Sequence, residues 1–507
     1  MKATWFILFA LILVVHSLTP GPFVYCKIIR RPLLSAMLLI VLLSSISCAR
    51  LAPDREVTKT QQALDVSMPS ADSVALDLSA INYEAEGARA WWREFDDPVL
   101  HQLIEKALAN SIDLKIAMTR LDEAMAAVRT SRADLYPTVN LETRTGVSTL
   151  DFSKDGLGFS RERINTNTLD LRLAWQIDLF GQLRGVATSA KASLESQGHQ
   201  LRDAQRLLVS QVAQSYYQII SIRERSKLII ESLKRRGENV MRIDDLLDKG
   251  YATLLDKTRT DSQYYEAKAS FEELQLAEAS ALNQLSVLVS MNPSKLRNDI
   301  RRMGKLFVPE KTLPLPTVNM LLAHRPDLRA AESNLRAAVH NVNSAKAALY
   351  PSLNLSANLG RGTGSEGTTR GVFPSLNSTV AGILMNVVTP IINRGRLLAA
   401  IDANSALLQQ AHLVYESSVL RAVTQIDTAM VTTDKNQGIY EQRRRASKSA
   451  QQAEKLSKEL FKSGELDYTS VIVAEDTRVS AEQNMIVAQT ALITAYISYL
   501  ADVVPVW

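Results

Sequence analysis

The hydrophobic positions of this chain follow a helical period in one stretch and repeat it 214 residues later (321 − 107 = 214). The two stretches are 107–146 and 321–360, and they agree without a gap at 15 of 40 positions. Their apolar residues share one spacing: Ala117, Leu121, Ala124 and Val128, then Ala331, Leu335, Ala338 and Val342. A line of small residues at this spacing predicts helices that pack closely along a coiled-coil-like contact. The repeat predicts a pseudo-twofold fold.

Both stretches contain a Leu-Tyr-Pro sequence, after which the period of the hydrophobic pattern changes to two residues. The clearest alternation is 169–179, where Leu, Trp and Ile residues alternate with Asp, Arg and Gln. The second copy alternates at 353–359 and less cleanly at 383–387. We therefore expect four amphipathic strands, two in each copy, of about 10–12 residues. Loops rich in Gly, Ser and Thr are expected at 149–167 and 361–377.

Such strands fit two environments. In a soluble sandwich the apolar face lies in the core, whereas in a membrane barrel it meets lipid and the charged face lines a wet lumen. An export signal and short strands favour the barrel. Four strands cannot close one, because the smallest barrels have about 8. The chain must then oligomerise, and two, three or four copies remain open.

A long helical region follows each strand pair, at 182–249 and 396–463. Leucines seven residues apart, at Leu194, Leu201 and Leu208, indicate a supercoiled contact. Each region ends at a glycine, Gly250 or Gly464, and a return helix is expected after it. At about 1.5 Å per residue, each helix would span roughly 100 Å. The two hairpin tips are therefore expected far from the strands.

The N-terminal part contains two apolar runs, 5–15 and 33–46, and only the second follows a cluster of basic residues. The second run predicts a signal peptide, with translation starting downstream of Met1, near Val24. It ends at Ser45-Ile46-Ser47-Cys48, which resembles a bacterial lipobox except for Ser45 in place of Leu. We expect Cys48 to carry the lipid, and Ala49 after it indicates the outer membrane. An ordinary signal peptide is the alternative.

These features divide the chain into four predicted parts. They are a signal peptide region (1–47), a lipid-anchored linker (48–90), a first repeat (91–304) and a second repeat (305–507). Asp97 is the expected N-cap of the first helix, with Pro98 in its first turn, and we expect Trp91 and Trp92 to pack internally. No long apolar run is apparent after residue 46, which argues against a polytopic helical membrane protein.

Charge and motif content argue against other classes. The net charge is +5, but the basic residues are scattered through mixed-sign helices, so we expect no nucleic-acid partner. The six histidines lack metal-ligand spacing, and the two cysteines lie near the N-terminus. Residues 362–367 fit a dinucleotide-binding pattern but stand in a polar stretch with no helix expected after them. We expect neither an enzyme nor a cofactor.

The order of helix, strand pair and long hairpin, written twice, resembles the TolC-like outer-membrane efflux proteins. It is most similar to their lipid-anchored branch, which serves resistance-nodulation-division pumps. The resemblance covers residues 91 to about 504. It is carried by Trp91-Trp92, Asp97-Pro98, both Leu-Tyr-Pro sites (135–137 and 349–351), the strand end at 175–181, Lys249-Gly250 and Ser463-Gly464.

The resemblance implies a mainly α protein with membrane β structure. Three copies would form a twelve-stranded outer-membrane barrel on a helical tunnel through the periplasm of a Gram-negative cell. The channel would conduct drugs or other small molecules passively to the exterior, after docking a periplasmic adaptor and an inner-membrane pump. A lipid-anchored coiled-coil adaptor or scaffold is the alternative function. Two hairpins, each preceded by a strand pair, favour the channel.

The resemblance also places the channel entrance at the hairpin tips, where acidic residues narrow it and select cations. This chain departs from that pattern, because Val473 stands nine residues after Gly464, where relatives often carry Asp. The tip and gate candidates are Lys249, Gly250, Asp256, Gly464, Asp467 and Tyr468. Three copies of Asp467 would make an acidic ring. A helix-capping role for Asp467 is the alternative.

Overall fold

The computed structural model describes residues 91–153, 159–300, 304–309, 324–366 and 377–503. All of them belong to the second of two units, Ala85–Trp507. The predicted signal peptide, the linker and Cys48 lie outside the described residues. Their assignments therefore stay predictions, as do the boundaries of the four predicted parts.

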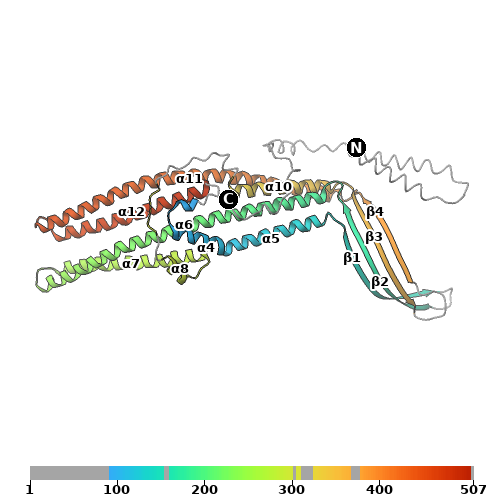
Figure 1. Ribbon diagram of the computed structural model, residues 1–507, viewed down its shortest axis with the longest axis horizontal. Helices are drawn as coiled ribbons and strands as arrows, with labels where there is room; N and C mark the ends of the chain where they lie inside the picture. The colour runs from blue at the N-terminus through green and yellow to red at the C-terminus, as the bar shows by residue number, and fades with distance from the viewer. Residues whose placement is uncertain (1–90, 154–158, 301–303, 310–323, 367–376, 504–507) are drawn as a thin grey trace. The chain divides into compact units, whose positions relative to one another are not determined.

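The order of helix, two strands and two long helices occurs twice among the described elements, and the first copy also contains η3, α4 and α8. The first copy comprises the 3-10 helix η3 (Trp91–Glu94), α4 (Pro98–Asn110), α5 (Ile112–Ala133), β1 (Thr138–Ser153), β2 (Phe159–Ile177), α6 (Gln182–Asp248), α7 (Leu254–Val289) and α8 (Pro293–Asp299). The second comprises α10 (Pro326–Ala347), β3 (Ser352–Glu366), β4 (Asn377–Val388), α11 (Arg394–Lys462) and α12 (Tyr468–Val503). The predicted order of helix, strand pair and hairpin is confirmed, and Figure 1 shows α6 with α7 and α11 with α12 as the two hairpins.

The first helix begins as its sequence predicts. Asp97 is the N-cap of α4, and its Oδ1 accepts hydrogen bonds from the backbone N–H groups of Val99 (3.0 Å) and Leu100 (3.3 Å). Trp91 and Trp92 are buried, so the prediction that they pack internally is confirmed. They belong to the core that α6 builds with its neighbours.

Helix α6 is the central element of this unit, because α5, α7, α10 and α12 all pack against it. The three predicted leucines of its supercoiled contact are buried, at 5%, 3% and 7% exposure for Leu194, Leu201 and Leu208. Ser196 Oγ and Ser189 Oγ donate hydrogen bonds of 3.0 Å to backbone carbonyls of α10. Small side chains on α6 therefore let α10 approach its backbone.

Helix α11 has the same place in the second copy and nearly the same length, 69 against 67 residues, but a different environment. Among the described elements, only α10 and α12 pack against it substantially. Large apolar side chains on its surface are solvent-exposed, among them Leu407, Leu413, Leu420, Val431 and Leu456. The two halves of the repeat thus share a fold but not a degree of burial.

The four strands form one antiparallel sheet in the order β1-β2-β3-β4. They contain 16, 19, 15 and 12 residues, so the expected length of about 10–12 holds only for β4. The expected loop boundaries are wrong, because residues 149–153, 159–167 and 361–366 lie in strands. Backbone pairing such as Thr149 with Arg163 extends the ladder past the apolar alternation, since ladder hydrogen bonds need no apolar side chain.

The two faces of the sheet differ as the alternation predicts. On one face Arg172 lies 3.3 Å from Glu142 and 3.9 Å from Asp170, and Arg144 lies 3.3 Å from Glu142. Gly360 faces Asp170 across the strand pair, and a Cβ at this glycine would lie 2.0 Å from the Asp170 carboxylate. The other face carries exposed apolar side chains: Val139, Leu141, Leu171, Leu359, Ile383, Met385 and Val387.

Two sequence expectations have a clear outcome here. Residues 362–366, part of the dinucleotide-binding pattern, lie in β3, so the described part of that pattern is extended strand and no phosphate-binding turn. The expectation that no long apolar run follows residue 46 is wrong for α12. Among the described residues, α12 alone is long and apolar enough to cross a membrane, but 67% of that stretch is buried inside the protein, as in the core helix of a soluble protein.

Candidate functional site

The first hairpin tip is closed by a glycine in the left-handed region. Helix α6 ends at Asp248 with Lys249 as its C-cap, and Gly250 after it has φ of 73°. The N–H of Tyr251 donates to the Leu246 carbonyl (2.7 Å), and the N–H of Gly250 donates to the Leu247 carbonyl (2.9 Å). This paired pattern is the Schellman motif, which satisfies the last carbonyls of a helix and requires a residue that tolerates positive φ.

The second tip repeats this geometry. Gly464 has φ of 80°, and its N–H donates to the Phe461 carbonyl at 3.1 Å. The N–H of Glu465 donates to the Leu460 carbonyl at 3.0 Å. Both predicted tip glycines therefore end their helices, and the two turns are built alike although their sequences differ.

The acidic candidate of the first tip caps the return helix. Thr253 and Asp256 form a capping box, in which each side chain accepts a hydrogen bond from the backbone N–H of the other. The Thr253 hydroxyl also donates to the Asp256 carboxylate at 2.6 Å. These hydrogen bonds, led by that of the hydroxyl, lower the pKa of Asp256 below its usual value.

The acidic candidate of the second tip is also in a capping position. Asp467 Oδ1 accepts hydrogen bonds from the Ser470 hydroxyl and from the Ser470 backbone N–H (3.3 Å). The Ser470 hydroxyl is the main cause that lowers the pKa of Asp467. Asp467 is exposed, so its charge faces solvent in the single chain. The capping alternative thus has direct contacts in its favour, whereas an acidic ring requires further copies.

The other tip candidates have different surroundings. Lys249 Nζ donates to Asp245 on its own helix at 2.6 Å. Tyr468 lies between the two hairpins, because its ring is 5.2 Å from the ring of Phe461 and the Arg242 guanidinium is 5.8 Å from its centroid. Tyr468 is therefore the predicted tip residue that connects α12 with α6.

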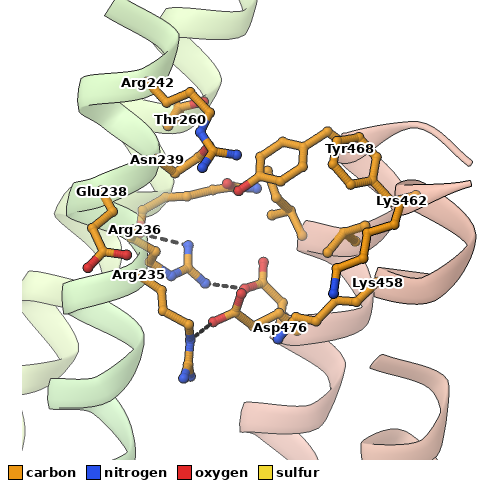
Figure 2. A pocket seen from close by; sticks show the side chains of 15 residues that line it. Arg235, Arg236, Glu238, Asn239, Arg242, Thr260, Lys458, Lys462, Tyr468 and Asp476 are labelled. Carbon is orange, nitrogen blue, oxygen red and sulfur yellow. Dashed lines mark hydrogen bonds and ion pairs between the residues drawn. The ribbon is translucent and has the colours of Figure 1, made fainter. Parts of the chain in front are cut away.

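Two ion pairs join the hairpins below the tips. Arg235 and Arg236 of α6 pair with Glu475 and Asp476 of α12, respectively, as the dashed lines of Figure 2 show. Arg236 also donates to the Gln263 carbonyl of α7 at 3.0 Å. Burial raises the pKa of Asp476, and Arg236 acts in the opposite direction. Four half-buried charged side chains thus tie the first hairpin to the second.

A cavity of about 330 Å³ lies beside these ion pairs. Its walls come from α6, α7, α11 and α12, with Asn239 and Thr260 on the first hairpin and Lys462 and Tyr468 on the second. Of the predicted tip and gate residues, only Tyr468 lines it. The structure therefore places a cavity between the hairpins where the sequence indicated only continuous helix.

Sequence reasoning missed the residues of the two ion pairs. A signal was present in the sequence: the basic pair at 235–236 lies 14–15 residues before its tip glycine, and the acidic pair at 475–476 lies 11–12 residues after the other, within about one helical turn of the same level. Because α6 runs toward its tip and α12 away from its own, similar spacings place opposite charges at one level. The described residues contain no group of three or more His, Cys, Asp and Glu side chains that could hold a metal ion.

Comparison with protein families identifies one match. The model of the family described as "Outer membrane efflux protein" matches residues 103–290 and 317–499. The two matched stretches correspond to the two copies of the repeat. They exclude the N-terminal region and cover most of the described residues.

Curated relatives match the chain over most of its length. The chain is 27% identical over 429 residues to the "Pyoverdine export outer membrane protein OpmQ" of Pseudomonas aeruginosa, which covers 82% of this chain and 87% of the relative. It is 26% identical over 443 residues to the "Probable outer membrane lipoprotein SilC" of Salmonella typhimurium, covering 87% and 91%.

Solved structures give the same result. The outer-membrane channel OprN is 26% identical, with a TM-score of 0.73 over 87% of this chain and 98% of that one. The CmeC outer membrane channel of Campylobacter jejuni has a TM-score of 0.74 over 87% of this chain, and at 19% identity it shows the shared fold alone. By the family match and these relatives together, the chain belongs to the outer membrane efflux protein family.

Proposed function

We propose that this protein is the exit duct of a tripartite efflux system, conducting small molecules from the periplasm across the outer membrane. The family and the outer-membrane relatives support this role. The single observation that carries it is the four-stranded sheet at the strand end of the long helices, with a charged face and an exposed apolar face. A soluble protein would bury such an apolar face, whereas lipid covers it without cost.

The sheet also supports assembly from several copies. Its edge strands, β1 and β4, have no further partner among the described strands. Unpaired edges bind other strands, and closure into a barrel removes them. Three copies give the twelve-stranded barrel that the resemblance implies, with β1 of one copy beside β4 of the next. The charged row of Glu142, Asp170 and Arg172 would then line the lumen.

The proposal includes a homotrimer, two partner proteins and a lipid anchor. A homotrimer would dock a periplasmic adaptor and, through it, an inner-membrane pump that supplies the energy. Cys48 would hold the protein to outer-membrane lipid, and one thioether-linked diacylglycerol with an N-acyl chain is sufficient for stable anchoring. The relative named as an outer membrane lipoprotein supports the anchor. The relatives described above give no support to the adaptor alternative.

The test is single-channel conductance of the detergent-purified, full-length protein in a planar bilayer. We expect discrete conductance steps, because a closed barrel with a charged lumen is filled with water. Without the adaptor and the pump the tips of the channel stay closed, and the conductance steps are then small or rare. Membrane insertion is therefore measured in parallel by flotation with liposomes. A protein that neither conducts nor floats with liposomes would overturn the proposal.

The gate proposal uses the same bilayer. We propose that three copies of Asp467 surround the entrance while each caps its own α12. Asparagine caps a helix as well as aspartate, so Asp467→Asn removes the charge and keeps the cap. The variant should show a lower preference for K⁺ over Cl⁻ than wild type. Asp434→Asn on the exposed surface of α11 is the control, and equal selectivity in all three proteins would leave Asp467 as a cap only.

A further inference from the structure

Helices α6 and α12 make a contact whose counterpart the single chain lacks. Residues of the two copies correspond at the offset of 214, which carries the bounds of α7, Leu254–Val289, onto those of α12, Tyr468–Val503. The contact of α6 with α12 therefore corresponds to a contact of α11 with α7. Among the described elements, α7 packs against α4, α6 and α8, whereas α11 packs against α10 and α12. No substantial contact joins α7 to α11 within the chain.

The face of α11 that would make this contact is exposed. Arg206, Arg235 and Arg242 mark the face of α6 that reaches α12, because each of them contacts a residue of α12. The corresponding positions of α11, and those between them at helical spacing, are exposed and include Leu420, Thr424, Val431, Gly438, Ser449 and Leu456. Apolar and small side chains along one exposed face are typical of a helix that packs against another.

The two contacts differ in chemistry at the end nearer the strands, and both partners differ together. Within the chain, Arg206 donates to Asp502 at 2.6 Å. The corresponding residues are Leu420 of α11 and Leu288 of α7, and Val287 beside Leu288 is 73% exposed. An ion pair in one contact thus corresponds to an apolar pair in the other. A charge facing an apolar side chain, which would cost free energy, does not arise at this position.

The same exchange occurs near the hairpin tips. The Arg242 guanidinium lies over the Tyr468 ring, and the corresponding residues are Leu456 and Leu254. Both leucines are exposed in the single chain, at 57% and 67%. A contact between them would remove apolar surface from water. The two ends of the missing contact therefore agree on one register.

We propose that α7 of a neighbouring copy covers α11, in the register in which α12 covers α6 within the chain. The partner is a second copy, because α6 and α12 separate α7 from α11 in one chain (Figure 1). The proposal rests on the proposed function, since it assigns a contact of the assembled duct. Each copy offers α11 on one side and α7 on the other, as a closed ring of identical chains requires.

One level of this contact lacks the ion pair that its counterpart has. Arg235 pairs with Glu475 inside the chain, whereas the corresponding residues are Ser449 and Asp261. Asp261 has an ion pair of 3.6 Å with Lys257 of its own helix. The contact between copies is therefore apolar at positions where the contact within the chain is charged. High salt, which screens ion pairs, should weaken it less than the contact within the chain.

The test is disulfide cross-linking of the detergent-purified, full-length protein. Leu456→Cys and Leu254→Cys are introduced together, and Leu420→Cys with Leu288→Cys forms a second pair at the other end of the contact. A disulfide needs Cα atoms about 4.4–6.8 Å apart, so oxidation by copper phenanthroline joins only residues in contact. We expect each pair to give covalent species of two and three chains on a non-reducing gel. A reductant should return them to single chains.

Leu456→Cys with Tyr265→Cys is the matched control. Tyr265 is also exposed on α7, but it lies 11 residues (265 − 254 = 11), about 16 Å, from the proposed partner of Leu456. This pair should give single chains, as should wild type, whose own cysteines are Cys26 and Cys48. Cross-linking within one chain, or equal cross-linking of the control, would overturn the proposal.

The mass of the particle separates this proposal from the exit duct. Absence of cross-links in a particle that native mass spectrometry shows to contain several chains would overturn the register alone. A particle of one chain would sink the assembled duct as well.

A gain of interaction tests the same register from the opposite direction. Ser449→Arg gives α11 the basic residue that α6 has at Arg235, opposite Asp261 of the neighbouring copy. We expect the oligomer to dissociate at a higher temperature than wild type, and the gain should disappear at high salt and in combination with Asp261→Asn. Ser449→Gln adds volume without charge and should leave the dissociation temperature unchanged. An equal gain with and without the Asp261 carboxylate would contradict the register.

Discussion

One carboxylate near the start of the first repeat holds three distant segments together. Asp97 caps α4 with Oδ1 and accepts a hydrogen bond of 2.6 Å from the Tyr216 hydroxyl of α6 with Oδ2. The same tyrosine oxygen accepts the Gly304 N–H at 3.0 Å. A Cβ at residue 304 would lie 2.1 Å from Asp97 Oδ2, so only glycine fits there. Burial raises the pKa of Tyr216, which keeps its hydroxyl protonated as a donor.

Removing that hydroxyl should destabilise the helical part of the protein. Tyr216→Phe leaves Asp97 Oδ2 and the Gly304 N–H without a buried partner, which should lower the free energy of unfolding by about 1–3 kcal/mol. The measurement is chemical unfolding in detergent followed by circular dichroism. Tyr217→Phe is the matched control, because Tyr217 is adjacent and buried but makes no hydrogen bond with the described residues. Equal destabilisation by both variants would contradict the role of the network.

Local signals were predictable at this scale, whereas partners distant in the chain were not. The N-cap of α4 and both tip glycines follow from short sequences, since capping depends on a few neighbouring residues. The partners of Arg236 and Tyr216 lie far away in sequence, and no period of a single segment reports them. Asp467 shows the limit of prediction from local sequence. Its capping contacts involve neighbouring residues, whereas its position relative to a channel axis depends on other copies of the chain.

At the scale of elements, the repeat predicts equal hairpins, and the structure makes them unequal. Among the described helices, α4, α5, α7, α10 and α12 all pack against α6, whereas α11 leaves large apolar side chains exposed. Leu413 and Leu420, seven residues apart, are 57% and 67% exposed. An apolar row at this spacing is typical of a helix that packs against another. We infer that a second copy covers α11 in the assembled duct.

A charge on that row should therefore block assembly without unfolding the chain. Leu420→Glu places a carboxylate where the neighbouring copy would bury it, and such a buried charge costs several kcal/mol. We expect monomers in detergent by light scattering, with the helical circular dichroism of wild type. Leu420→Met keeps the volume and apolar character and should assemble normally. A trimer of wild-type mass in Leu420→Glu would show that this face of α11 is free.

Element types were easier to predict than element ends. The long helices were expected at 182–249 and 396–463 and are found within two residues of those bounds, because helix-breaking glycines mark their ends. The strands extend beyond the segments in which apolar and polar residues alternate. One example is the pair Leu150 and Glu162, which belongs to the ladder but lies outside such a segment. Side-chain patterns report the buried part of a strand, whereas backbone pairing determines its length.

At the scale of the whole molecule, the offset of 214 residues carried most of the information. It placed two hairpins and two strand pairs in one chain, which separates a channel of this family from an adaptor with a single hairpin. It could not determine the number of copies, because the closing contacts lie between chains. The open edges of β1 and β4 and the exposed side of α11 are where those contacts are expected.

The mass of the purified particle tests the central claim most directly. The full-length protein, extracted in mild detergent, is measured by native mass spectrometry after the detergent is removed in the gas phase. Three copies closing one barrel predict a particle of three times the mass of the mature chain, with little monomer. A monodisperse monomer, or a particle of two or four chains, would contradict the trimeric duct.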